Sequence, residues 1–91
     1  MEVGDIVFVN HAFLGSHPQE GFVYEKYNIG SDKPGVSVIL KDGNDLGGFS
    51  QQEQTDYLEF KRKSGLTYSF KNVLQLDKDF RDGYFTKAFG D

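Results

Sequence analysis

Apolar and polar residues alternate most clearly near the middle of the chain, in the stretch 35–41. Val36, Val38 and Leu40 fall on one face of an extended strand, and Ile39 adds an apolar side chain to the other face. A strand with apolar groups on both faces is typical of the centre of a sheet rather than its edge. We therefore predict a central strand over 35–41 that is covered on both sides.

The alternation stops after this strand in a polar segment that contains several glycines. Asp42-Gly43 is a dipeptide that tolerates positive φ, and the residues that follow prolong the break, so we predict a loop over 42–48. Ser50 and Glu53 then have the spacing of a capping box, in which each side chain satisfies the other residue's free backbone N–H. The pattern therefore predicts a short helix from about residue 51.

Further strands are predicted wherever short apolar segments lie between turn signals. Among them, 66–70 alternates most cleanly and would bury Leu66, Tyr68 and Phe70 on one face. The remaining predicted strands are 3–9, 21–27 and 73–76.

The connections are predicted from polar residues, Gly and Pro. Residues 57–60 fit both a strand and a helix face, so that boundary stays open. Asp77 can cap a turn of helix at about 77–82, which is followed by an extended C-terminal segment. The predicted connections are 10–20, 28–34 and 61–65.

Short strands separated by polar turns favour a mainly β fold over a parallel α/β sheet, which needs longer helices. We expect a single domain over 1–91, a small SH3-like barrel or sandwich of five to six short antiparallel strands with one or two short helices. Val3–Val7, which reads VGDIV, and Gly21–Val23, which reads GFV, resemble the first two strands of SH3-like and Tudor-like domains. The resemblance implies a binding module rather than a catalyst. The chain lacks Trp and an acidic cluster in its first long loop, so no binding residues transfer from peptide-binding SH3 domains.

Composition narrows the function further. The chain has no Cys, which excludes a disulfide framework, a thiolate metal site and a thiol nucleophile. No segment reads as a signal peptide or a membrane span, so we expect a cytoplasmic protein that does not enter a membrane. Nine Phe and five Tyr are most simply explained as packing in a small β domain.

Catalytic chemistry has few candidates in this sequence. His11 and His17 are the only histidines and fall in the same predicted loop, where we interpret them as ordinary histidines rather than metal ligands. No Ser lies in a nucleophile-elbow pattern, and neither phosphate-binding glycine motif is present. We therefore expect no enzyme activity and no cofactor.

One segment partly matches an EF-hand loop. From Asp42 to Glu53 several oxygen-bearing residues fall at ligand positions, but Leu46 occupies position five, and a strand rather than a helix comes first. Glu53 is also needed for the capping box with Ser50. We predict a structural turn and helix cap that bind no metal.

The functional hypothesis is a non-enzymatic module that binds another protein, with its oligomeric state left open. Tyrosine close to Asn, Ser and Gly is the composition of adaptable interfaces. The candidate binding residues are Asp42, Asn44, Asp45, Ser50 and Tyr57.

Two alternatives involve nucleic acid. Rows of carboxylates could imitate it in an acidic inhibitor, although the net charge is only −4. Surface aromatics could instead stack on single-stranded bases while basic residues follow the backbone, although the net negative charge argues against this. The carboxylates are Asp42, Asp45, Glu53, Asp56, Glu59, Asp77, Asp79 and Asp82, and the basic residues are Lys61, Arg62, Lys63 and Lys71.

Overall fold

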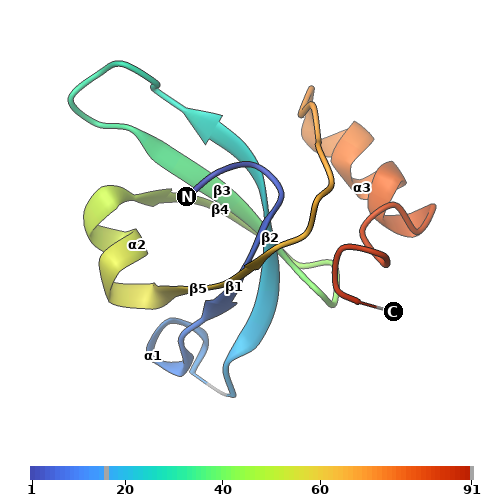
Figure 1. Cartoon of the computed structure of the whole chain (residues 1–91), viewed down its shortest axis with the longest axis horizontal. Coiled ribbons are helices and arrows are strands. Elements are labelled where there is room, and N and C mark those ends of the chain that lie inside the picture. Colours follow the sequence, from blue (N-terminus) through green and yellow to red (C-terminus); the bar gives the residue numbers. More distant parts are fainter. Residues whose placement is uncertain (16, 91) are drawn as a thin grey trace.

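The computed structural model describes residues 1–15 and 17–90, without the side chains of residues 11 and 12. Five antiparallel strands in this part form one sheet of order β4-β3-β2-β1-β5, so that β4 and β5 are its two edges (Figure 1). The mainly β prediction is confirmed, as an open sheet rather than a closed barrel. In chain order the elements are β1 (Asp5–Val9), α1 (His11–Leu14), β2 (Gln19–Tyr27), β3 (Gly35–Leu40), β4 (Asp45–Ser50), α2 (Gln51–Tyr57), β5 (Leu58–Lys63) and α3 (Val73–Arg81).

The sheet is buried on both faces, with α2 on one side and α3 on the other (Figure 1). Alternate residues of each inner strand therefore enter different cores. The α2-side core consists of Val7, Val9, Val23, Val36, Val38, Leu40, Phe49 and Leu58. The α3-side core consists of Ile6, Phe22, Tyr24, Ile39, Leu76, Phe85, Ala88 and Phe89.

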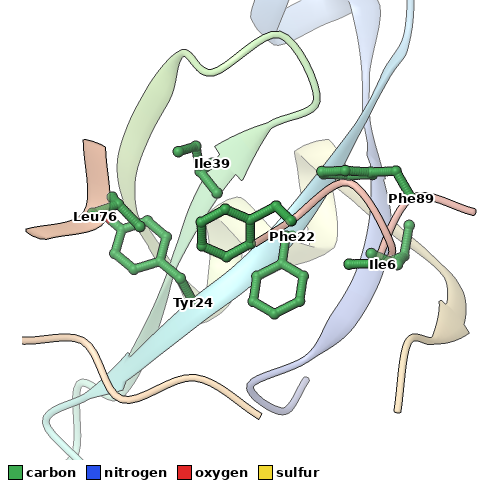
Figure 2. Packing of buried hydrophobic residues seen from close by; sticks show 8 residues of the cluster. Ile6, Phe22, Tyr24, Ile39, Leu76 and Phe89 are labelled. Atoms are coloured by element: carbon green, nitrogen blue, oxygen red, sulfur yellow. The ribbon is translucent and has the colours of Figure 1, made fainter. Parts of the chain in front are cut away.

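The C-terminal third of the chain supplies the cover of the α3-side core. Figure 2 shows Phe22 and Tyr24 of β2 among side chains from β1, β3, α3 and the C-terminal segment. The ring of Phe85 meets the ring of Phe22 edge-on, with centroids 4.9 Å apart. Since such aromatic pairs add to the free energy gained by burial, this contact helps to hold the C-terminal segment against the sheet.

The predicted central strand is confirmed as β3, which pairs with β2 and β4 and is buried along its whole length. Val38 enters the α2-side core and Ile39 enters the α3-side core, as the alternation predicted. The capping box is also confirmed. The backbone N–H of Glu53 donates to Ser50 Oγ at 3.2 Å, and the N–H of Ser50 donates to Glu53 Oε1 at 3.0 Å.

The predicted loop over 42–48 is wrong, because its second half is the edge strand β4. Gly48 belongs in this strand for a packing reason: the ring of Tyr27 lies across Gly35 and Gly48, and a Cβ on either glycine would overlap it. A tight turn remains, in which Gly43 has a φ of 95° and its N–H donates to the carbonyl of Leu40. Gly48 therefore marks the close approach of the Tyr27 ring rather than a loop.

The turn predicted at 61–65 begins later, because β5 continues to Lys63. The open boundary at 57–60 is now settled: α2 ends at Tyr57 and β5 starts at the next residue. The strand predicted at 66–70 is wrong in its pairing, since this segment belongs to no sheet in the described structure. Its side-chain directions are nevertheless correct, because three alternate residues pack against the α3-side core, namely Leu66, Tyr68 and Phe70.

The strand predicted at 73–76 is also wrong, because these residues form the first turns of α3. The N-cap of α3 is Asn72 rather than the predicted Asp77. Asn72 Oδ1 accepts a hydrogen bond from the N–H of Gln75 at 2.8 Å. The extended C-terminal segment is replaced by consecutive turns over 82–90. The predicted connection 10–20 contains α1 and the beginning of β2.

Candidate functional site

A cleft of about 570 Å³ lies beside the junction of α2 and β5. We call it the α2–β5 cleft. Its walls combine two aromatic rings, a proline and buried leucine with hydroxyl, amide and carboxylate groups. The lining residues are Phe8, Asn10, Pro18, Thr55, Asp56, Tyr57, Leu58 and Glu59.

One wall of the cleft is a cross-strand row centred on Phe8. Phe8 in β1 lies opposite Glu20 in β2 and opposite Glu59 in β5, so an aromatic ring stands between two carboxylates. Lys61 Nζ lies 5.1 Å from the centroid of the Phe8 ring and 2.8 Å from Glu20 Oε1. The Glu20 side of the ring therefore already holds an ammonium group.

The other wall is the end of α2. The helix passes into β5 without a loop, and the backbone N–H of Asn10 donates to the carbonyl of Tyr57 at 2.7 Å. The Tyr57 ring packs on Phe13 of α1, with centroids 5.3 Å apart. Asp56 is exposed, and its Oδ1 accepts from Gln52 Nε2 at 3.0 Å. This wall is thus built on regular, hydrogen-bonded structure.

The predicted binding residues of the β3–β4 turn lie elsewhere. Asp42 and Asn44 are exposed in the turn, where Asp42 Oδ1 accepts from the N–H of Asn44 at 2.9 Å. Asp45 lines a second, smaller hollow of about 170 Å³ next to the start of α3. There Val73 and Leu74 expose most of their side chains.

Asp45 also has a structural partner. Tyr24 Oη donates to Asp45 Oδ1 at 2.7 Å, and the N–H of Gly47 donates to the same oxygen at 2.9 Å. Burial of the phenol, followed by its bond to the Asp45 carboxylate, raises the pKa of Tyr24 far above its usual range. The Asp45 carboxylate therefore helps to fix β4 in place.

The five predicted residues consequently do not form one site. Ser50 caps α2, Tyr57 lines the α2–β5 cleft, and the other three lie at the β3–β4 turn and the start of β4. Phe8 and Pro18 were missed as site residues, and Glu59 was named only among the carboxylates of the acidic-inhibitor alternative. The sequence signal for Phe8 was the alternation of Val7, Phe8 and Val9, which places a large aromatic ring on the face opposite two buried valines.

The described residues hold no group of three or more His, Asp or Glu side chains arranged to bind a metal. His17 is exposed, and the side chain of His11 lies outside the described residues. In the segment that partly matches an EF-hand loop, β4 replaces the middle of the loop, and Glu53 is engaged in the capping box.

The charges invoked for nucleic-acid alternatives are divided or already paired. Glu53 and Asp56 belong to α2, whereas Asp77 and Asp79 belong to α3, and these two helices stand on opposite sides of the sheet (Figure 1). Among the basic residues, Lys61 contacts Glu20, Arg62 donates to the carbonyl of Ala88, and Lys63 contacts Asp5. Asp45 and Asp77 nevertheless line the same small hollow beside α3.

Comparisons with protein-family models, curated proteins and solved structures found no match to this chain. In the part of the chain that the structure describes, no helix has the length and apolar character needed to cross a membrane. The function must therefore be argued from the geometry of the α2–β5 cleft.

Proposed function

We propose that the chain is a non-enzymatic protein-binding module and that the α2–β5 cleft is its recognition surface. The observation that carries this proposal is the composition of the cleft. Phe8 and Tyr57 provide aromatic walls, while Thr55, Asp56 and Glu59 form an exposed polar rim. Aromatic residues surrounded by a polar rim are typical of protein interfaces.

The position of the cleft favours a protein segment as its occupant. Leu58 and Glu59 belong to β5, which is a terminal strand of the sheet and has β1 as its one neighbour there. A terminal strand can receive an extended segment of another protein through backbone hydrogen bonds, while nearby pockets select its side chains. Phe60, which exposes half of its side chain, continues the apolar surface along the same strand.

The resemblance to SH3-like and Tudor-like domains supports the same class of function. The two segments that carry the resemblance are neighbours in the fold, since Ile6 pairs with Phe22 and Val7 pairs with Gly21. An SH3-like fold thus stays part of the proposal, and fold-level likeness supports a binding role only as a prior.

A selection from displayed random peptides tests the proposal. We expect enriched peptides to bind the wild-type chain and to lose binding to Thr55→Trp, because Thr55 is exposed on the cleft rim and a bulky ring there would fill the cleft. Thr67→Trp is the matched control, since Thr67 is exposed on the segment that packs on the α3-side core. Failure to enrich any peptide, or peptides that bind Thr55→Trp as well as wild type, would contradict the proposal.

A further inference from the structure

We infer that the α2–β5 cleft binds a Lys or Arg side chain of the partner protein. This inference rests on the proposed protein-binding function and specifies the partner's chemistry. It starts from an intramolecular example beside the cleft: the ammonium group of Lys61 lies over the Phe8 ring while it contacts Glu20. A ring face together with a carboxylate is a favourable environment for a cation.

Phe8 has a second carboxylate neighbour on the β5 side. Glu59 lies directly across from Phe8, as Glu20 does on the other side. The side chain of Glu59 is exposed and has no hydrogen-bond or ion-pair partner among the residues that the structure describes. Asp56 provides a second carboxylate on the rim, and within the described part of the chain its side chain is bound to the neutral amide of Gln52 alone.

The shape of the cleft also suits a long cationic side chain. Leu58, Pro18, Tyr57 and Phe8 give the cleft apolar and aromatic lining, against which the methylene stem of such a side chain can pack. The two rim carboxylates make the cleft unfavourable for an acidic side chain because like charges repel. Charge complementarity therefore selects a basic occupant.

The direct test is a titration of the ¹⁵N-labelled protein with n-butylguanidinium, monitored by amide chemical shifts. We expect saturable shifts centred on Phe8, Tyr57 and Glu59, with a Kd on the order of millimolar for so small a fragment. The uncharged isostere n-butylurea should produce much smaller shifts at the same residues. Equal shifts with the two compounds, or no shifts at the cleft, would overturn the inference.

Charge-removing variants sharpen the test. Glu59→Gln and Asp56→Asn should each weaken binding of n-butylguanidinium about five-fold, because each removes a carboxylate from the rim. Asp32→Asn is the control, since Asp32 is exposed in the connection between β2 and β3 and the substitution changes the net charge equally. If Asp32→Asn weakens binding as much as the rim variants do, the effect is one of overall charge and the inference is wrong.

The peptide selection separates this inference from the proposed function. We expect the enriched peptides to share a Lys or Arg, with that preference lost when Glu59→Gln and Asp56→Asn are combined. Peptides that Thr55→Trp blocks but that lack a basic residue would overturn the cationic occupant and leave the protein-binding function standing. If no peptide is enriched, the proposed function itself fails.

Discussion

Tyr24 and Asp45 are joined by a hydrogen bond of 2.7 Å that spans an intervening strand. Tyr24 lies in β2 and Asp45 begins β4, while β3 lies between these strands in the sheet. The phenol is nearly fully buried, whereas the carboxylate is at the partly exposed edge. This bond therefore links the edge strand to the α3-side core independently of the backbone ladder.

Loss of that bond should destabilise the protein. We expect Tyr24→Phe to lower the free energy of unfolding by about 1–3 kcal/mol, since the carboxylate of Asp45 loses a partly buried donor. Asp45→Asn should cost less, because its side-chain oxygen still accepts a hydrogen bond. Urea denaturation of both single variants and the double variant gives the coupling energy. Strictly additive effects would show that the two residues act independently.

Stability should also fall in alkaline solution. Burial, followed by a hydrogen bond to a carboxylate, raises the pKa of Tyr24 and of Tyr68 above the usual value. The native state therefore keeps both phenol protons at a pH where the unfolded chain, with a tyrosine pKa of about 10, has released them. The stabilisation is present below about pH 10 and decreases as the pH rises beyond it.

Urea denaturation from pH 8 to pH 11 measures this decrease, and Tyr24→Phe combined with Tyr68→Phe supplies the control. We expect the double variant to lose less stability than the wild type over the same range, although lysines titrate in both proteins. Tyrosinate absorbance should develop in parallel with unfolding for these two residues. Their ionisation in the folded protein near pH 10 would contradict the prediction.

The Ser50 cap allows a separate test of the calcium interpretation. Ser50→Ala should lower the free energy of unfolding by about 0.5–2 kcal/mol, because it removes the acceptor for the N–H of Glu53. Millimolar calcium should leave the melting temperature of wild type unchanged, since a ligand bound to the native state would raise it. A rise of several degrees that disappears in Asp42→Ala would make this segment a metal site.

The C-terminal cover depends on Phe85, which is fully buried and contacts the rings of Phe22, Tyr68 and Phe80. Phe85→Ala should reduce the free energy of unfolding by about 3–5 kcal/mol, because it opens a cavity between the sheet and its cover. Thr86→Ala, at an exposed neighbouring position, should cost under about 0.5 kcal/mol. Comparable losses in the two variants, measured by urea denaturation, would show that the cover contributes little.

The sequence predicted correctly those elements that depend on residues close to one another along the chain. The alternation from Val36 to Leu40 identified β3 because both cores lie directly against that strand. The Ser50–Glu53 spacing identified the start of α2 because the capping box is made by those two residues alone. The side-chain directions of Leu66 and Phe70 were predicted correctly because side chains alternate along any extended segment, whether or not it pairs in a sheet.

Elements that depend on distant partners were missed. The glycines of β4 indicated a loop, but Gly48 lies in the strand against the ring of Tyr27, which is about twenty residues away. The segment 66–70 alternates like a strand, but none of the described strands pairs with it to complete a ladder. Phe8 and Glu59 are far apart in sequence, so only the pairing of β1 with β5 could bring them together.

The central claim is that the α2–β5 cleft, rather than the β3–β4 turn, receives the partner protein. The most direct measurement is amide chemical-shift mapping of the ¹⁵N-labelled protein during titration with an enriched peptide. Our account predicts the largest shifts at Phe8, Tyr57 and Glu59, with little change near Asp42 or Leu74. Shifts centred on Asp42, Asp45 and Leu74 would contradict it and assign binding to the hollow beside α3.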